Sequence, residues 1–218
     1  MNITLYYSPY SEALVPYVAL REAGAEFQVQ PINPRKGEDR TPEYTRITPT
    51  QRIPAMTIDG KPLTEVVAMM YFIAHAFPQA GLLPSNFDDE ARAIALLTWC
   101  ASGIHPHVQR LAHPARFCEA PGHESLKRQA IASIHKTFGI AEQRLESREY
   151  LFERFTSADI YLFWCIRRAS IAGAPLPAQF PNCNAFFSRV EARPSVQKVY
   201  AFEREVLEAF GWGAGSAH

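Results

Sequence analysis

The chain has 218 residues, of which 47% are hydrophobic, so it is long enough for one large domain or two small ones with a real core. Its 22 Lys and Arg balance its 22 Asp and Glu, so no net charge draws it toward nucleic acid or an anionic membrane surface. No secretory leader is visible, and no apolar run approaches the roughly 20 residues that span a bilayer. We therefore expect a cytoplasmic protein whose partner is a small molecule or another protein.

The first third of the chain predicts a βαβ unit. Residues 2–7 (NITLYY) and 26–32 (EFQVQPI) alternate in polarity, as strands do. Between them, residues 11–24 (SEALVPYVALREAG) predict a helix with Ser11 as its N-cap. The two strands of such a unit must be parallel.

A second set of elements follows a polar loop over residues 33–51, in which only a short helix near residues 43–47 is expected. Asp59-Gly60 joins two short apolar runs and predicts an antiparallel hairpin. Thr64 is the expected N-cap of a nearly all-apolar helix that Pro78 stops. The order β-α-β-β-β-α is the thioredoxin-like arrangement.

Beyond this point only helical periodicity is visible. One long helix is expected from Asp88 through Trp99 toward residue 107, and others over residues 123–147, 155–173 and 182–210, the last broken at Pro194. Thr156 and Asp159 have the spacing of a capping box. The predicted fold class is α+β: a thioredoxin-like domain (residues 1–78), a linker (79–87) and an all-α domain (88–218).

The four cysteines lie at positions 100, 118, 165 and 183, without any Cys-x-x-Cys pair. Cys100 and Cys165 fall on predicted helices and are expected to be buried thiols. Disulfides are not expected. A metal site built from His105, His107 and His113 has poor helical spacing, so no metal is expected either.

Five motifs in order resemble the cytosolic glutathione S-transferase superfamily along nearly the whole chain. They are LYYSP (5–9), RIPAM (52–56), LTEVVAMMYFIA (63–74), FTSADIYLF (155–163) and RPSVQKV (193–199). YYSP, ALREAG and the histidine of ASGIHPH, His105, are most similar to the bacterial beta type. In the beta type the turn after the first strand carries a cysteine, and Glu12 stands there in this chain.

The resemblance implies a glutathione site in the first domain. Pro54 would be cis, and the backbone of Ile53 would pair with the cysteinyl part of the tripeptide. The Glu65 side chain would take the ammonium, and N–H groups at the following helix start would take the γ-glutamyl carboxylate. Many members carry a serine where Val66 stands, so here only the N–H remains. Arg52 would bind the glycyl carboxylate, with Arg35 and Lys36 as alternatives.

The residue that activates the glutathione thiol stays open at this stage. Ser11 is the first candidate, because a hydroxyl at a helix start can donate to a thiolate and lower the thiol pKa. Tyr7 matches the position where other classes of the superfamily carry a catalytic tyrosine, and Tyr10 lies between the two. Backbone N–H groups or a bound water are further alternatives. Glu12 cannot form a disulfide, which excludes exchange through a protein thiol at this turn.

Tyr10 and His105 are expected to line the pocket for the second substrate, with Trp99, Phe117 and Trp164 either adding apolar wall or packing in the core. The resulting hypothesis is a homodimeric glutathione S-transferase with a role in detoxification. Glutathione is its substrate, and the activated thiol attacks a small hydrophobic electrophile or a peroxide. The alternative is a transferase-like protein without strong catalysis that acts as a protein-interaction or regulatory module.

Overall fold

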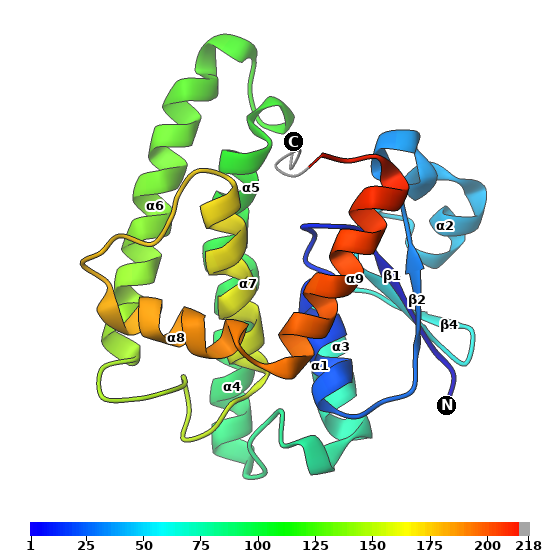
Figure 1. The fold of residues 1–218 in the computed structure, drawn as a ribbon, viewed down its shortest axis with the longest axis horizontal. Coiled ribbons are helices and arrows are strands. Elements are labelled where there is room, and N and C mark those ends of the chain that lie inside the picture. Colours follow the sequence, from blue (N-terminus) through cyan, green and yellow to red (C-terminus); the bar gives the residue numbers. More distant parts are fainter. Residues whose placement is uncertain (214–218) are drawn as a thin grey trace. The chain divides into compact units, whose positions relative to one another are not determined.

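The computed structural model describes residues 1–213, and the chain forms two compact units (Figure 1). Of the described residues, the first unit contains 1–83 and 194–213, and the second contains 84–193. Residues 214–218, the end of the predicted all-α domain, lie outside the described residues. No helix among the described residues is long and apolar enough to cross a membrane.

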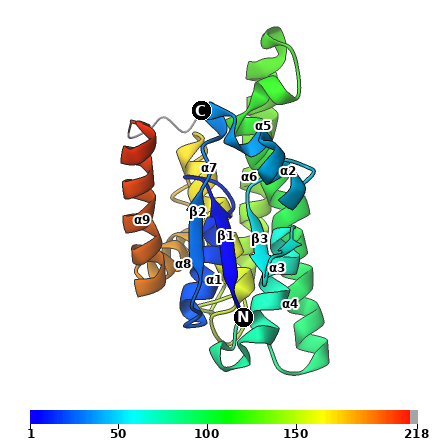
Figure 2. The same ribbon diagram turned by 90° about the vertical axis from the view of Figure 1, so that its right-hand side faces the viewer.

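The first unit is built on a four-stranded sheet of order β2-β1-β3-β4 (Figure 2). The sheet's strands are β1 (Ile3–Tyr7), β2 (Gln28–Pro31), β3 (Ala55–Ile58) and β4 (Lys61–Leu63). β1 and β2 are parallel, and β3 is antiparallel to both β1 and β4. The predicted βαβ unit and the hairpin at Asp59-Gly60 are both confirmed, with positive φ at both turn residues (48° and 78°) as a type I′ turn requires.

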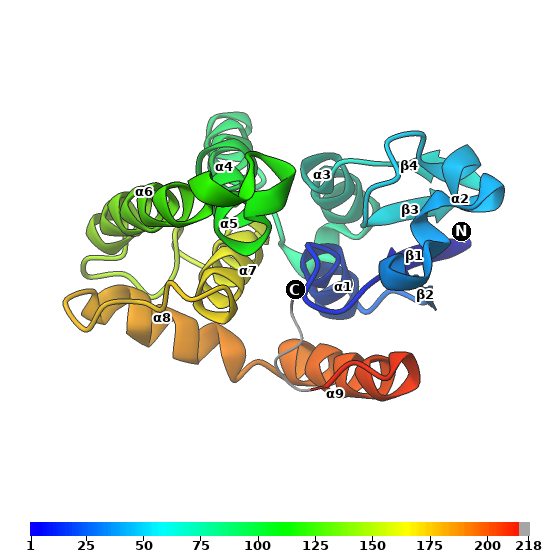
Figure 3. The ribbon, with the colours of Figure 1, turned by 90° about the horizontal axis from the view of Figure 1, so that it is seen from above.

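Helices cover both faces of this sheet. They are α1 (Leu14–Glu22), α2 (Pro42–Ile47) and α3 (Val66–Ala76), with short 3-10 turns η1 (Pro34–Lys36), η2 (Glu38–Arg40) and η3 (Pro78–Ala80). Figure 3 shows α1 and α3 on one face and α2 on the other. Residues 14–20 of α1 are all buried, which makes α1 the central helix of the unit. The predicted thioredoxin-like arrangement is therefore present.

Two predicted helix caps are wrong. α1 begins at Leu14 rather than beside Ser11, because residues 8–11 form a separate turn in which the Ser11 N–H donates to the Ser8 carbonyl. α3 begins at Val66, and its N-cap is Glu65 rather than Thr64. Glu65 has φ +68°, so the chain reverses at this residue and Thr64 falls outside the helix.

The last helix, α9 (Pro194–Phe210), belongs to the first unit, whereas the sequence grouped it with the all-α domain. Figure 3 shows α1 between α3 and α9. The ring of Phe202 meets Tyr7 and Tyr17 edge-on, with centroids 5.5 and 5.4 Å away. Ser195 also donates a short hydrogen bond to the Glu22 carboxylate at the end of α1. These contacts to α1 and β1 explain why α9 packs here.

The second unit is helical around α7 (Ser157–Ile171), which is buried along most of its length. The surrounding elements are α4 (Phe87–Trp99), the π-helical segment η4 (Cys100–Ile104), α5 (His105–Ala112), the turns η5 (Pro114–Arg116) and η6 (Ala120–Gly122), α6 (His123–Arg144) and α8 (Pro181–Glu191). The single long helix expected from Asp88 toward residue 107 is thus interrupted by a π segment, a feature frequent at functional sites.

The predicted capping box of Thr156 and Asp159 is confirmed at the start of α7. The Asp159 carboxylate accepts from the N–H groups of Leu151 and Thr156 at 2.8 and 2.7 Å, and from the Thr156 hydroxyl. Burial nevertheless raises the pKa of Asp159 to about 6, because three hydrogen bonds only partly replace the lost hydration. This pair secures the central helix.

All four cysteines are free thiols, and Cys100 and Cys165 are buried as expected. Cys183 is also buried, and burial together with the nearby Glu142 carboxylate raises the pKa of its thiol. These three cysteines lie in the core of the helical unit as small apolar residues.

Candidate functional site

Four chain segments meet at one edge of the sheet. β1 and β2 end there, β3 begins there, and β4 ends there, since Tyr7 pairs with Pro31, Tyr6 with Ala55, and Met56 with Leu63. In order across the edge lie the residues after β2 (32–37), the turn after β1 (8–11), the residues before β3 (52–54) and those after β4 (64–66). Most of the glutathione contacts predicted from the sequence fall in the last three segments. Arg35 and Lys36, the alternatives for the glycyl carboxylate, lie in the first.

The turn of residues 8–11 holds Ser11 by its own backbone. The Ser11 hydroxyl donates to the Ser8 carbonyl at 2.6 Å, and its oxygen accepts from the Ala13 N–H at 3.3 Å. The same Ser8 carbonyl also accepts from the Ser11 N–H at 3.2 Å. Rotation of the hydroxyl toward a thiolate would therefore cost one neutral hydrogen bond, about 1 kcal/mol, without leaving the carbonyl unsatisfied.

Tyr7 points away from this edge and into the interior. Its side chain is fully buried, and its hydroxyl donates to Oε2 of Glu203 on α9 at 2.8 Å. The same oxygen accepts from the N–H of Tyr10 at 2.9 Å. Tyr10 has φ +62°, an unusual conformation for an aromatic residue, and the bond to Glu203 holds it there. The structure thus gives Tyr7 a packing role with a satisfied hydroxyl.

Segment 52–54 contains the cis proline that the sequence predicts. The Ile53–Pro54 peptide is cis. The Tyr44 hydroxyl donates to the carbonyl of Arg52 at 2.7 Å, and burial, helped by the charge of Asp39, raises the pKa of this phenol so that it stays protonated. Arg52 itself is exposed. α2 thus fixes the backbone beside Ile53.

Glu65 and Val66 form the fourth segment. Glu65 is exposed and adopts φ +68° and ψ 117°, a conformation that costs about 1–3 kcal/mol and persists only where the surroundings enforce it. Val66 is the first residue of α3, so its N–H has no partner within the helix and points out from the helix start. An exposed carboxylate and helix N–H groups therefore lie side by side, as recognition of an amino acid's ammonium and carboxylate requires.

His105 belongs to the helical unit, at the end of the π segment. Its ring meets the edge of Trp164 at a centroid distance of 4.7 Å, and its Nε2 lies 2.8 Å from Nε2 of Gln109. His107, two residues on, has its pKa lowered first by burial and then by the charge of Arg110. Tyr10 and His105 lie in different units, so their meeting in one pocket remains a prediction.

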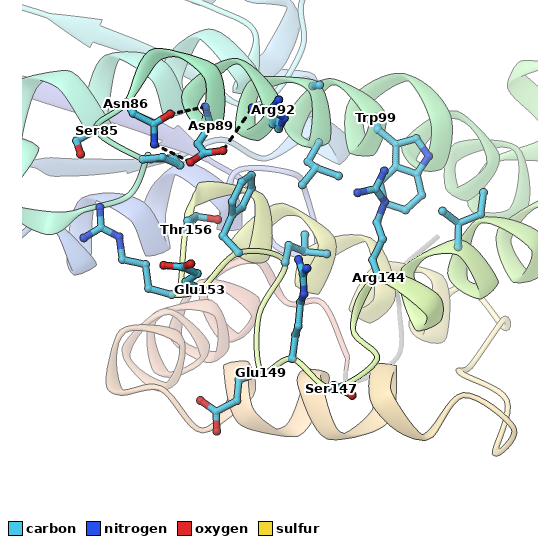
Figure 4. Close-up of a pocket in the computed structure, with 18 residues that line it drawn as sticks. Ser85, Asn86, Asp89, Arg92, Trp99, Arg144, Ser147, Glu149, Glu153 and Thr156 are labelled. Atoms are coloured by element: carbon cyan, nitrogen blue, oxygen red, sulfur yellow. Dashed lines mark hydrogen bonds and ion pairs between the residues drawn. The ribbon is translucent and has the colours of Figure 1, made fainter.

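A cavity of about 1440 Å³ in the helical unit contains none of the predicted glutathione or catalytic residues (Figure 4). It lies among α4, the end of α6 and residues 147–156, and Trp99 and Arg144 are among its lining side chains. Trp99 therefore faces this cavity rather than only the core. Among the described residues, no group of His, Cys, Asp and Glu side chains is arranged to hold a metal ion.

Comparison with known proteins identifies this arrangement. Residues 1–75 match the family model "Glutathione S-transferase, N-terminal domain", and residues 107–189 match "Glutathione S-transferase, C-terminal domain". The chain belongs to the glutathione S-transferase superfamily. The two matched domains, in the family's order, make it a glutathione transferase with the predicted fold.

Relatives match over almost their full length. Glutathione S-transferase GstA of Escherichia coli O157:H7 is 29% identical, covering 91% of this chain and 98% of its own. A glutathione transferase homologue from Sulfitobacter, solved with bound glutathione, has a TM-score of 0.84 at 26% identity and covers 92% and 97% of the two chains. BphK, a bacterial transferase solved as a ternary complex, has a TM-score of 0.83 at 28% identity, with 92% and 99% covered.

Sequence reasoning missed Glu203, although a signal for it was present. Val196, Val199, Glu203 and Val206 are spaced by three or four residues and form the buried stripe of α9. An acid on an apolar stripe of this kind is buried with the stripe and needs donors. What the sequence could not give is the identity of those donors, which lie almost 200 positions away.

Proposed function

We propose that this glutathione transferase binds glutathione across the sheet edge made by residues 8–11, 52–54 and 64–66, and activates its thiol for attack on a small hydrophobic electrophile or a peroxide. The observation that carries the proposal is the pair formed by Glu65 and the start of α3. An exposed carboxylate on a residue with positive φ, beside helix N–H groups, is a receptor for the γ-glutamyl end of the tripeptide.

The remaining contacts follow from the order of segments along the edge. With the γ-glutamyl group at Glu65 and Val66, the next segment is 52–54, where the backbone of Ile53 would pair with the cysteinyl residue beside Pro54. The thiol would then face the adjacent turn of residues 8–11. The glycyl carboxylate would bind a cation, for which Arg52, Arg35 and Lys36 are the candidates.

Ser11 is the residue we assign to thiol activation. Its hydroxyl lies in the turn that faces the thiol, and its present acceptor, the Ser8 carbonyl, keeps the Ser11 N–H when the hydroxyl rotates. Tyr7, the other candidate, is bonded to Glu203 in the interior and takes no part in this proposal. We assign the chain to the bacterial beta-like type, with Glu12 in place of the beta-type cysteine.

A test of binding compares Glu65→Gln and Glu65→Ala with Glu43→Gln. Glu43 is a matched control, because it is also an exposed acid at a helix start in the same unit. Loss of the ammonium partner should weaken glutathione binding about 10- to 100-fold in calorimetry for both Glu65 variants. The control should bind as the parent does. An unchanged glutathione affinity in Glu65→Ala would show that glutathione does not bind at this position.

A test of activation compares Ser11→Ala with Ser11→Thr, which keeps a hydroxyl. Ser11→Ala should lower kcat by about 100-fold with a chloronitrobenzene or an organic hydroperoxide as second substrate, because one donor to the developing anion is lost. Ser11→Thr should retain most of the rate. A near-normal rate in Ser11→Ala would mean that Tyr10 or backbone N–H groups activate the thiol instead.

A second candidate function is glutathione binding with weak turnover, as a protein-interaction or regulatory module. It is favoured by the 2.6 Å bond through which the Ser11 hydroxyl donates to Ser8 instead of facing outward. Tight binding with no thiolate absorbance and no effect of Ser11→Ala would support this alternative.

We further propose that Tyr10 and His105 belong to the pocket for the second substrate.

We also propose that the protein is a homodimer. Tyr71 on α3 is exposed by 47% and Phe87 at the start of α4 by 84%, and aromatic exposure of this kind is usual at protein contacts. Light scattering of the pure protein should give a mass near twice the 24.5 kDa chain. A monomer at micromolar concentration would contradict the homodimer.

A further inference from the structure

The chain turns sharply at the end of α9. Gly211 has φ +66°, its N–H donates to the carbonyl of Glu208, and the N–H of Trp212 donates to the carbonyl of Leu207 at 2.9 Å. The left-handed conformation suits glycine and ends the helix. The ring of Trp212 then packs beside Phe210, with centroids 5.4 Å apart. The position of Trp212 is thus fixed by the helix end rather than by a loose tail.

Arg35 lies against this ring. Its guanidinium carbon is 4.2 Å from the centroid of Trp212, well within the range of a cation–π contact. Arg35 sits in η1, whose backbone is held by the buried Asn33: the Asn33 side chain accepts from the Arg35 N–H, and the Asn33 N–H donates to the Glu38 carboxylate at 2.7 Å. Both the backbone of Arg35 and its guanidinium are therefore ordered.

A stacked arginine keeps its hydrogen-bonding capacity. The ring of Trp212 covers one face of the guanidinium, whereas the N–H donors of arginine lie in the plane and point outward. In general, the donors of an arginine hold a carboxylate with two parallel bonds. Ordering a long side chain beforehand also removes an entropy cost that binding would otherwise carry.

The loop that carries Arg35 lies at the same sheet edge as the glutathione segments. Ile32, just before it, packs in one apolar cluster with Tyr44, Ala55 and Ile53. The Ile32 N–H also donates to the carbonyl of Tyr7 at 2.7 Å, which ties the loop to the turn of residues 8–11. From β4 to β2 the edge spans three strand spacings, about 14 Å, comparable with an extended tripeptide plus an arginine side chain.

We propose that Trp212 is a positioning residue that holds Arg35 to bind the glycyl carboxylate of glutathione, so that the segment after α9 sets the affinity for this end of the substrate. The inference rests on the proposed function. Arg52 and Lys36 offer the same charge, but among the described residues neither side chain has a hydrogen bond, an ion pair or a ring contact that would order it. Arg35 is therefore the pre-organised cation of the three.

The test measures calorimetric affinity for two ligands, glutathione and its glycyl monoethyl ester, in which the carboxylate is masked. The variants are Trp212→Leu, Trp212→Phe, Arg35→Ala and the double variant Trp212→Leu/Arg35→Ala. Arg46→Ala is the matched cation control, because Arg46 is an exposed arginine on α2 in the same unit. Circular dichroism of each variant checks that the unit is folded.

Arg35→Ala should bind glutathione about 10- to 30-fold more weakly, and Trp212→Leu about 5- to 10-fold. The double variant should be no weaker than Arg35→Ala, because Trp212 acts only through Arg35. Trp212→Phe should retain most of the affinity. All variants should bind the ester as the parent does, and the control Arg46→Ala should leave both affinities unchanged.

Two results would overturn the inference while leaving the proposed function intact. Equal losses for glutathione and the ester in Trp212→Leu would mean a general structural role, and unchanged glutathione affinity in Arg35→Ala would place the carboxylate elsewhere. Failure of the parent protein to bind either ligand would instead overturn the proposed function, and this inference with it.

Discussion

The buried Glu203 carboxylate gives the sharpest prediction about the site's framework. Glu203 is 3% exposed, and one of its oxygens accepts from the Tyr7 hydroxyl and the Tyr10 N–H. Glu203→Ala would leave both donors without that acceptor inside the unit. Each hydrogen bond to a charged acceptor contributes about 1.5–3 kcal/mol, and relief from burying the carboxylate offsets part of the sum. We expect a net loss of about 3 kcal/mol in the free energy of unfolding.

The loss should affect the turn of residues 8–11 as well as global stability. Tyr10 holds φ +62° with its N–H on Glu203, and without that bond the turn can relax to a less strained conformation. Ser11 follows directly, so thiol activation should fall together with stability. Glu203→Gln keeps an acceptor oxygen and should cost only about 1–2 kcal/mol.

The assay is urea unfolding followed by circular dichroism, combined with hydrogen exchange of the peptide containing residues 8–13. Glu205→Ala is the matched control, because Glu205 is an exposed acid on the same helix and should change stability by about 0.5 kcal/mol or less. Faster exchange of the 8–13 peptide in Glu203→Ala, but not in Glu205→Ala, is expected. A Glu203→Ala protein with parental stability and exchange would refute the reasoning.

Three further predictions concern the helical unit. Burial raises the pKa of Asp159 from 3.8 to about 6. Between these two pH values the native state therefore binds more protons than the unfolded state, and the contribution of this carboxyl to stability falls as pH rises. The parent should therefore gain about 2 kcal/mol over Asp159→Asn between about pH 7 and pH 4.5 in urea unfolding, and a pH-independent difference would contradict the burial effect. The Glu142 carboxylate accepts from the N–H groups of Asn182 and Cys183 at the start of α8. Glu142→Ala should therefore lower the free energy of unfolding by about 2 kcal/mol, and Glu142→Gln should lower it less. Equal losses in the two variants would count against an effect of the charge. A Cβ at Gly103 would lie 2.8 Å from Cδ1 of Trp99. Gly103→Ala should therefore lower the free energy of unfolding by about 1–3 kcal/mol and shift the tryptophan fluorescence. An unperturbed spectrum would show that Trp99 has room to move.

Local signals in the sequence were reliable where a few neighbouring residues decide the conformation. Asp59-Gly60 specifies its own turn, and Thr156 with Asp159 specifies its own capping box, because all the partners lie within four positions. Ser11 and Thr64 carry the right side chains for caps, yet neither caps a helix. In the first case the turn of residues 8–11 uses the serine for its own bonds, and in the second the positive φ of Glu65 moves the helix start.

Long-range partners account for what the sequence could not supply. The hydroxyl of Tyr7 has the same chemistry whether it faces a thiol or Glu203, and only the packing of α9 on α1 decides between them. The contact of Arg35 with Trp212 likewise joins a loop near the start of the chain to the segment after the last helix. Motif resemblance predicted the binding segments, but it carried no information about these supporting residues.

The central claim is that this transferase binds glutathione at the sheet edge and ionises its thiol. Calorimetric titration with glutathione at about pH 7, followed on the same sample by an ultraviolet difference scan for thiolate absorbance, tests both parts at once. We predict saturable binding with a thiolate signal that Ser11→Ala reduces and Glu65→Ala abolishes along with binding. Absence of binding, or binding that Glu65→Ala leaves unchanged, would contradict the account.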